Sequence, residues 1–407
     1  ARARVISRWT GEDSTLIQLE GHGREDLFAD IDLTRSVGWF TSLFPVRLTA
    51  GVELGASLKA VKEQLRAIPN KGIGFGVLRY LGSDAVRETL RALPQPAITF
   101  NYLGQFDSSF DAGQAALFTP ASEARGAEQS LDALLSSPLT LNGGIYGGEF
   151  SLGWTFSERM FERGTVQALA DDYAQELAAL IEHCCRDGMH GVTPSDFPLA
   201  PLSQAQLDGL PLPSSLIEDI YLPSPMQQGM LFYTMYEEEA GDYINQTRAD
   251  VQGLDVERFR AAWQAALQAH DVLRSGFLWQ GERPVQVVHK QVELPFSVQD
   301  WRGRRDYQAD LDALAAQERK RGFELTAAPL LRLCLVRIDD DTCHLIYTNH
   351  HILMDGWGNS QLMGEVLHRY SGQPLAQSVG RYRDYIAWLQ RQDGSVSESF
   401  WKTQLAD

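Results

Sequence analysis

Hydrophobic and polar positions follow one another along the chain in patterns that predict a mixture of strands and helices. Apolar runs predict strands at 14–20, 97–99 and 286–288 and hairpins over 139–156 and 331–349. Apolar residues at helical spacing predict helices over 166–181, 255–267, 305–320, 359–370 and 382–389. This mixture indicates the α/β fold class, in which helices cover a sheet.

Several of these elements carry more specific expectations. The first hairpin is expected to turn at Asn142-Gly143-Gly144, and the second at Asp339-Asp340-Asp341. In the helix predicted over 166–181, the apolar stripe from Val166 to Ile181 should face the core. Asp255 should cap the helix that follows it, because its carboxylate can accept from the first free amides.

Prolines mark a boundary near the middle of the chain. Seven of the 17 prolines lie between residues 193 and 225, and proline stiffens connections and interrupts strand pairing. We therefore expect a linker over 198–215, with a boundary near Leu212, between domains at 1–197 and 216–407. A length of 407 residues suits two to three domains.

Composition argues against several classes of partner. The net charge is −17, and the lysines and arginines are outnumbered and unclustered. Neither nucleic acid nor an anionic membrane surface is therefore expected as a partner. No apolar run reaches the length of a membrane span, and no signal peptide is visible. The four cysteines, Cys184, Cys185, Cys334 and Cys343, lack CxxC spacing, so we expect reduced cysteines in a cytoplasmic protein.

The clearest candidate for chemistry follows the second hairpin, where the sequence HHILMDG occupies residues 350–356. A strand end is a rigid platform from which side chains can meet a ligand, and neutral imidazole can accept a proton near pH 7. Adjacent histidines on a strand point in opposite directions, so a metal would find at most two ligands here, and we expect no metal site. A satisfied core histidine pair is the structural alternative.

The HHxxxDG pattern at 350–356 resembles the signature of the condensation-domain superfamily of nonribosomal peptide synthetases, whose fold is shared with chloramphenicol acetyltransferase. The stretches 219–232 and 270–277 are similar to further motifs of that family. The letters SPMQQGMLF in the first are typical of the subtype that joins a D-configured donor to an L-configured acceptor. Residues 221–223 read Tyr-Leu-Pro where the family usually has Tyr-Pro-Leu. The resemblance implies that 216–407 is the N-terminal lobe of a condensation domain.

The first part of the chain resembles a different member of the same superfamily. EGHGRE at 20–25, the stretch 32–46, the glycine-rich 71–80 and FNYLGQFD at 100–107 are similar to motifs in the C-terminal half of an epimerization domain. Ser36 stands where that family usually has threonine. The resemblance implies two chloramphenicol-acetyltransferase-like lobes, each with a mixed sheet and flanking helices.

The resemblance also implies roles for the residues around HHxxxDG. His351 would accept or position the proton of an acceptor amine, while His350 would be packed. Asp355 would orient the loop, and the backbone N–H of Gly356 would bind the developing oxyanion. Arg274 would form an ion pair with Asp355; an exposed Arg274 is the alternative.

For the first part, the resemblance implies that Glu20 is one of two acid/base groups that remove and return the Cα proton of a bound thioester. The second group would lie upstream of residue 1. His22 and Arg24 place an imidazole and a guanidinium in reach of Glu20, and Asn101 and Tyr102 would border the thioester. The structural alternative makes Glu20 a partner of Arg24 that pins the loop.

The substrates implied by the resemblance arrive on other domains. They would be carried on 4′-phosphopantetheine arms by aminoacyl or peptidyl carrier domains upstream and downstream, and this chain would hold no cofactor. Because both chain ends lie within helical patterns, we expect a piece of a longer polypeptide, inactive without its missing halves. Two alternatives stay open. One is a non-catalytic module that docks carrier domains. The other is a free-standing acyltransferase, against which the two different half-domain signatures argue.

Overall fold

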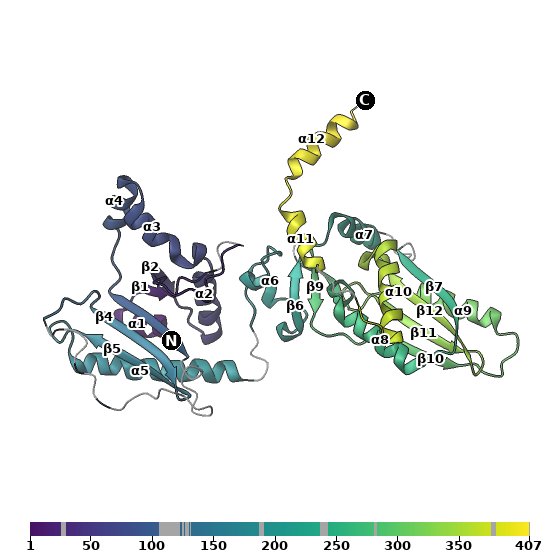
Figure 1. Ribbon diagram of the computed structural model, residues 1–407, viewed down its shortest axis with the longest axis horizontal. Helices are drawn as coiled ribbons and strands as arrows, with labels where there is room; N and C mark the ends of the chain where they lie inside the picture. The colour runs from purple at the N-terminus through teal and green to yellow at the C-terminus, as the bar shows by residue number, and fades with distance from the viewer. Residues whose placement is uncertain are drawn as a thin grey trace. The chain divides into compact units, whose positions relative to one another are not determined.

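Two compact units make up the chain, Ala1–Gly191 and Val192–Asp407. The computed structural model describes residues 1–25, 30–105, 123, 126, 130, 132–186, 191–236, 243–280, 283–375 and 380–406 (Figure 1). The end of the 100–107 motif, Phe106 and Asp107, lies outside these residues. The first unit contains one sheet and the second contains two, and each unit has its own hydrophobic core.

The first unit is built on a mixed five-stranded sheet in the order β2-β1-β3-β4-β5. Its strands are β1 (Ser14–Gly21), β2 (Ser42–Thr49), β3 (Ile98–Gln105), β4 (Leu139–Tyr146) and β5 (Glu149–Phe156). β1 pairs antiparallel with β2 and parallel with β3, and β4 pairs parallel with β3 and antiparallel with β5. The predicted strands at 14–20 and 97–99 are therefore confirmed.

Helices pack against this sheet and complete the core of the first unit (Figure 1). They are α1 (Arg2–Thr10), α2 (Leu54–Arg66), the 3-10 turn η1 (Pro69–Gly72), α3 (Ile73–Leu81) and α5 (Arg163–Cys185). A further helix, α4 (Asp84–Ala92), lies beside α3 and has no buried residue. Ile6 of α1 and Val166 of α5 join Ile17 and Leu141 of the sheet in one cluster. Burial of these apolar side chains is the main force that holds the layers together.

Two local predictions for the first unit were wrong. The hairpin turns at Gly147-Gly148, not at Asn142-Gly143-Gly144, which lies within β4. Both turn glycines have positive φ, 60° and 77°, as a tight two-residue hairpin turn requires. On α5, Ile181 is exposed and Glu176 is buried, because Glu176 pairs with Arg4 and Arg8 of α1. Glu176 thus adds a buried ion pair beside the apolar stripe.

The second unit contains two sheets, one of four strands in the order β10-β11-β12-β7 and one of three in the order β6-β9-β8. The strands are β6 (Ile217–Tyr221), β7 (Ile244–Gln252), β8 (Ser275–Gln280), β9 (Arg283–His289), β10 (Phe296–Asp300), β11 (Leu331–Arg337) and β12 (Thr342–His350). β11 and β12 form the predicted hairpin around Asp339-Asp340-Asp341, and its place in the chain is confirmed.

The helices of the second unit are α6 (Gln204–Asp208), α7 (Pro225–Tyr236), α8 (Val256–Ala269), α9 (Gln308–Lys320), α10 (Gly356–Ser371), α11 (Tyr382–Gln390) and α12 (Gly394–Gln404). Helices α8 and α10 cover one face of the four-stranded sheet and α9 covers the other (Figure 1). Short 3-10 turns are η3 (Pro194–Asp196), η4 (Ser214–Leu216), η5 (Asp271–Arg274) and η6 (His351–Leu353). The predicted helices over 255–267, 305–320, 359–370 and 382–389 are confirmed within a few residues.

Alternation along β12 explains how one strand serves two cores. Leu345 and Tyr347 face the cluster that α8 and α10 complete, whereas Ile346 faces the cluster that α9 completes. Successive side chains of a strand point to opposite faces, so a continuous apolar run is what a strand covered on both sides requires. Asp255 caps α8 as expected, accepting from the backbone N–H of Arg258 at 3.1 Å.

The segment expected to be a linker is packed in the structure. Phe197, Ala200, Leu202, Leu207 and Leu210 are buried in one cluster with residues of β6, β8 and β9. The division between the two units lies at Gly191/Val192, upstream of the expected linker 198–215. The proline-rich segment is therefore not a free linker, because its leucines pack against one face of the three-stranded sheet.

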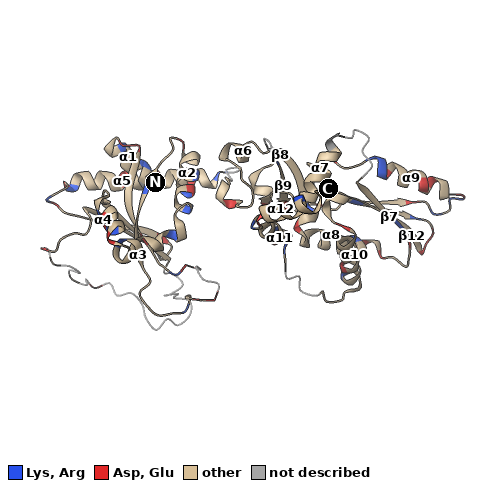
Figure 2. Ribbon diagram, turned by 90° about the horizontal axis from the view of Figure 1, so that it is seen from above, with Lys and Arg blue, Asp and Glu red and all other residues tan. Residues whose placement is uncertain are grey.

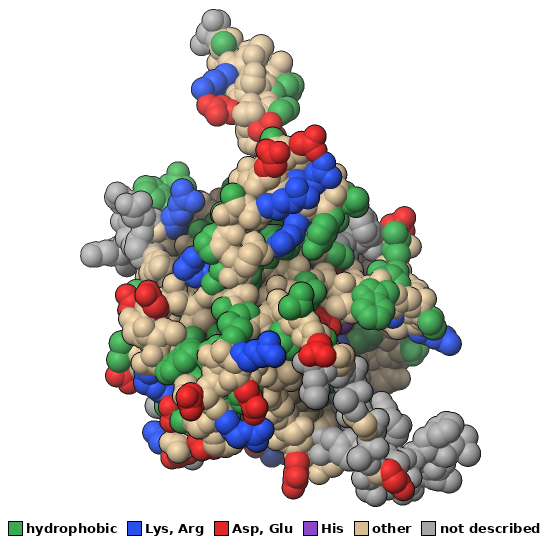
Figure 3. All heavy atoms as spheres, turned by 90° about the vertical axis from the view of Figure 1, so that its left-hand side faces the viewer, with side chains coloured by type: hydrophobic (Ala, Val, Ile, Leu, Met, Phe, Trp, Pro, Cys, Tyr) green, Lys and Arg blue, Asp and Glu red, His purple; other side chains and the backbone are tan. Residues whose placement is uncertain are grey.

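Surface charge and apolar exposure bear on possible partners. Lysine, arginine and acidic residues are scattered over both units and form no single basic face among the described residues (Figure 2). Apolar side chains gather in several places on the face shown in Figure 3. Among the residues that the structure describes, no helix combines the length and apolar character needed to cross a membrane. Cys184 and Cys185 are exposed at the end of α5, Cys334 and Cys343 are buried, and all four are free.

Candidate functional site

His350, the last residue of β12, is a buried and neutral histidine. The residue is 3% exposed, and its ring atom Nδ1 accepts the backbone N–H of Ile352 at 3.1 Å. Burial, with a smaller contribution from the neighbouring His351, lowers the pKa of His350 to about 4. A neutral ring that already accepts a backbone hydrogen bond is a structural group, and the expectation that His350 is packed agrees with this arrangement.

His351 begins the turn η6 and is only half-buried. Its backbone N–H donates to the carbonyl oxygen of Tyr243 at 2.7 Å, which holds the start of the turn against the residue before β7. Ring atom Nδ1 lies 3.0 Å from the carbonyl oxygen of Met354 and 3.1 Å from Nδ2 of Asn245. Both neighbours lie at Nδ1, so Nε2 is the ring nitrogen that can face a substrate.

Asp355 and Gly356 form the start of α10. The Asp355 carboxylate accepts the backbone N–H of Gly358 at 2.7 Å, which is the geometry of an N-cap. Gly356 is the first residue of the helix, where backbone N–H groups have no partner within the helix. The role expected for Asp355, that of orienting the loop, fits this cap.

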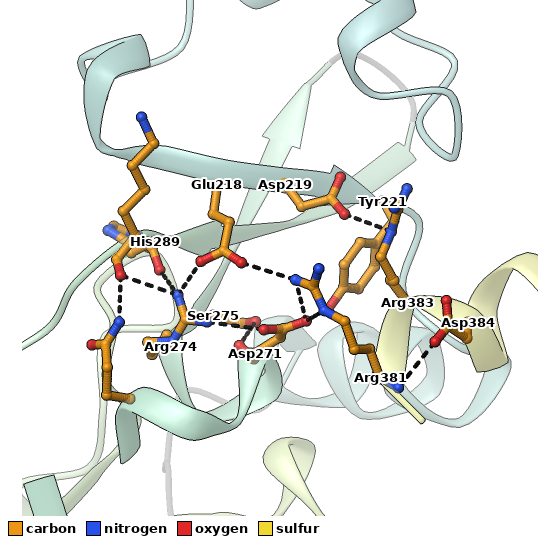
Figure 4. A network of polar contacts seen from close by, with 12 residues as sticks. Glu218, Asp219, Tyr221, Asp271, Arg274, Ser275, His289, Arg381, Arg383 and Asp384 are labelled. Atoms are coloured by element: carbon orange, nitrogen blue, oxygen red, sulfur yellow. Dashed lines mark hydrogen bonds and ion pairs between the residues drawn. The ribbon is translucent and has the colours of Figure 1, made fainter. Parts of the chain in front are cut away.

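Arg274 does not pair with Asp355, and it is not exposed, so both expectations for it were wrong. Its guanidinium is 3% exposed and donates to Glu218 at 2.6 Å and to Asp271 at 2.9 Å (Figure 4). It also donates to the carbonyl oxygen of His289. Arg381, which immediately precedes α11, bonds to the same two carboxylates, each at 2.8 Å. Arg274 therefore links η5 to β6 and β9, and it makes no contact with the N-cap Asp355. Arg381 ties the start of α11 to the same two carboxylates.

Glu20 lies near the end of β1 and borders a cavity of about 380 Å³ in the first unit. The cavity lies between the sheet and helices α1, α2 and α5, and its lining is mainly apolar. The residues that line it are Ala1, Ala3, Arg4, Leu19, Glu20, Phe44, Leu48, Ser57, Leu58, Val61, Leu65, Phe100, Tyr102, Tyr173 and Leu180. Glu20 and Tyr102, which come from separate sequence motifs, thus meet at one cavity.

Other residues expected near Glu20 lie elsewhere. Asn101 pairs across the sheet with Asn142 and is not part of the cavity lining. His22 is exposed and accepts the backbone N–H of Arg24 at 3.0 Å through Nδ1. The guanidinium of Arg24 donates to the carbonyl oxygen of Leu33 at 2.5 Å and lies over the ring of Phe40, 4.4 Å from its centroid. The structural alternative, in which Glu20 pins the loop as a partner of Arg24, is therefore wrong.

The loop after β1 is held by close backbone contact. Gly23 has φ +66°, and a Cβ atom there would lie 1.6 Å from the carbonyl oxygen of Phe40. Only glycine fits that position. Glu25 completes the loop with an ion pair to Lys71 at 2.5 Å. This second contact ties the loop to the turn η1.

Reasoning from the sequence missed Asn245, Glu218 and Arg381. Glu218 and Arg381 are 163 residues apart in the chain and meet only through tertiary folding. Asn245 is a polar residue on a strand, and nothing in its local pattern marks it. Among the described residues, no three His, Cys, Asp or Glu side chains gather as a metal site would require.

Similarity to known proteins extends over nearly the whole chain. A family model described as "Condensation domain" matches residues 2–197 and 217–407. The chain is 40% identical over its whole length to a protein of the linear gramicidin synthase of Brevibacillus parabrevis, of which it covers 5%. It is 34% identical over 97% of its length to bacitracin synthase 3 of Bacillus licheniformis, of which it covers 6%. The chain thus spans a small part of these curated relatives.

Two similar solved structures each align with less than half of the chain. The epimerization domain from the third module of tyrocidine synthetase B is 36% identical, covering 45% of this chain and 40% of that one, with a TM-score of 0.41. The starter condensation domain of rhizomide synthetase RzmA is 20% identical, covering 47% of this chain and 50% of that one, with a TM-score of 0.43.

Proposed function

Because the chain belongs to the condensation-domain family of nonribosomal peptide synthetases, we propose that it joins two catalytic halves of such a synthetase. Residues 1–197 would be the C-terminal half of an epimerization domain. Residues 216–407 would be the N-terminal half of a condensation domain that takes a D-configured donor and an L-configured acceptor. The observation that carries this proposal is the double match of one family model, to 2–197 and to 217–407, over stretches with different motifs.

In the second unit, the proposed reaction is peptide-bond formation between two carrier-bound thioesters. The α-amine of the acceptor attacks the carbonyl carbon of the donor thioester, the C–N bond forms, and the donor's carrier thiol leaves. His351 would accept the amine proton at Nε2, while His350 supports the turn through its bond to Ile352. The first amide of α10, at Gly356, would bind the developing oxyanion, as the start of a helix offers free N–H groups.

Much of the rate would come from holding both reactants in place. Each substrate would arrive on a 4′-phosphopantetheine arm of a neighbouring carrier domain, as tethered substrate and not as a cofactor of this chain. Tethering converts a bimolecular step into an effectively unimolecular one. The carrier domains upstream and downstream are therefore the proposed partners.

In the first unit, the proposed reaction is inversion at the Cα of a carrier-bound residue. The thioester acidifies the Cα proton, Glu20 would transfer a proton on one face, and a second group upstream of residue 1 would serve the other face. The cavity that Glu20 and Tyr102 share supports this assignment, because its mainly apolar lining can hold apolar parts of a substrate beside the Glu20 carboxylate. Arg4, which also lines the cavity, is already paired with Glu176.

The experiment assays both reactions in the full 407-residue chain and in the same chain joined to the missing halves. We expect neither activity from the chain alone, peptide formation and Cα proton exchange from the completed protein, and loss of each by His351→Ala and Glu20→Gln respectively. His22→Ala and Glu149→Gln, both at exposed residues that do not line the cavity, serve as controls. A completed protein that binds loaded carriers without reaction would instead favour the docking-module alternative.

A further inference from the structure

Two groups from different parts of the second unit meet the same ring nitrogen of His351. The carbonyl oxygen of Met354 lies 3.0 Å from Nδ1, and the side-chain amide of Asn245 lies 3.1 Å from it. Asn245 stands on β7, where it faces Asn349 of β12 across the antiparallel pair. The backbone bond from His351 to Tyr243 fixes this end of β7 beside the turn, so the approach of Asn245 is built into the sheet.

The chemistry of these two neighbours decides where the proton of the neutral ring lies. A backbone carbonyl oxygen accepts hydrogen bonds and never donates, so at 3.0 Å it requires a proton on Nδ1. The amide of Asn245 can present either its oxygen or its nitrogen, because turning the group by about 180° about Cβ–Cγ exchanges them with little movement of heavy atoms. The fixed carbonyl of Met354 therefore places the ring proton on Nδ1, and the Asn245 amide turns its oxygen toward that proton.

We propose that Asn245 is a positioning residue for His351, whose side-chain oxygen shares the Nδ1–H with the Met354 carbonyl and so leaves Nε2 unprotonated. Two acceptor oxygens at Nδ1 hold the ring in one orientation and stabilise the tautomer that can take a proton at Nε2. The inference rests on the proposed function, because it assigns Nε2 as the atom that receives the amine proton. An unprotonated Nε2 cannot donate a hydrogen bond to the amine, so His351 acts through this atom as the base.

The surroundings of Asn245 make this arrangement testable. Asn245 is exposed, so its replacement removes no core packing. Its neighbour Gln246 points to the opposite face of β7 and donates to the carbonyl oxygen of Ala315 at 2.9 Å and to the Thr348 hydroxyl at 3.1 Å. Gln246→Ala therefore removes a side-chain amide from the same strand without touching His351, which makes it a matched control.

The test is ¹⁵N NMR of the histidine ring nitrogens in the full chain, with His351 assigned by the His351→Gln variant. At a pH where the ring is neutral, we expect the parent to carry its proton on Nδ1. Asn245→Ala should lower the ratio of Nδ1–H to Nε2–H tautomer by about threefold to tenfold, the worth of one hydrogen bond. Asn245→Asp should restore the Nδ1–H form, and Gln246→Ala should leave the ratio at the parent value.

The inference is overturned by a parent ring protonated at Nε2, or by a tautomer ratio that Asn245→Ala does not change. Each is read without catalysis, so the proposed function fails or stands separately through His351→Ala in the completed protein. In that completed protein, Asn245→Ala should reduce kcat by about threefold to tenfold with KM unchanged, because the ring and not the substrate loses a contact. Equal loss in the Gln246→Ala control would also count against Asn245.

Discussion

Arg274 offers a direct test of how much a buried ion pair contributes to this fold. Its guanidinium is 3% exposed and bridges Glu218 and Asp271, while Arg302 bridges Asp300 and Asp340 at a site where it is 45% exposed. The two arginines thus make the same kind of two-carboxylate contact in different surroundings. We compare Arg274→Met with Arg302→Met, since methionine preserves much of the apolar stem and removes the charge.

The expected cost follows from what remains after substitution. Removing one member of a buried charge network typically costs about 3–5 kcal/mol, because the partner charge stays buried without compensation. Here Arg381 still contacts Asp271 and Glu218, so we expect the lower value, about 3 kcal/mol. Arg302→Met should leave stability at the parent value, because solvent screens exposed pairs.

Hydrogen exchange of the full chain, read by mass spectrometry, measures the effect within the second unit alone. Peptides from β6, η5 and β9 should exchange about a hundredfold faster in Arg274→Met if exchange occurs through opening of this region, since each 1.4 kcal/mol is about tenfold in an equilibrium. Peptides from the first unit serve as internal references. The reasoning is refuted if Arg274→Met exchanges at the parent rate, or if Arg302→Met matches it.

Two further predictions concern single residues. Burial lowers the pKa of His350 to about 4 from an ordinary value near 6.5, so the unfolded state binds its proton first as pH falls. The contribution of His350 to the free energy of unfolding should be fully present above about pH 6.5 and decline on the order of 3 kcal/mol toward pH 4. Urea unfolding of the parent and of His350→Gln measures this contribution as the difference between the two proteins. A difference that does not change with pH would contradict the prediction. Asn70 in the turn η1 has φ 45°, a left-handed conformation that glycine adopts without steric cost, so Asn70→Gly should raise stability by about 1 kcal/mol or less and Asn70→Ala should lower it. Thermal unfolding of the three proteins measures this order, and a stabilising Asn70→Ala would rule out backbone strain as the cause.

Local pattern predicted the elements of the second unit well. The hairpin of β11 and β12 and the capped helix α8 depend on residues within one stretch, so periodicity and a capping carboxylate were sufficient. The same reasoning misplaced the first hairpin turn, because Asn142-Gly143-Gly144 and Gly147-Gly148 are both plausible turns and only strand register distinguishes them. It also placed Ile181 inward, although this residue is exposed, and it missed that Glu176 is buried where it pairs with α1.

The candidate site, too, was predicted only in part from the sequence. Motifs alone located His350 and His351 at a strand end and Glu20 and Tyr102 in separate stretches. Only the folded chain brought Glu20 and Tyr102 to one cavity and placed Asn245 beside His351.

The sequence by itself determined the alternation of strands and helices, the two-part organisation, and the position of the HHxxxDG turn after a buried strand. It determined these because hydrophobic periodicity and short-range turn and cap chemistry act within one stretch of chain. Tertiary structure alone decided the partners of Arg274, the packing of residues 197–210 against the three-stranded sheet, and the contacts at Nδ1 of His351. Those pairings join residues far apart in sequence, and their energy depends on burial and distance, which exist only once the chain has folded.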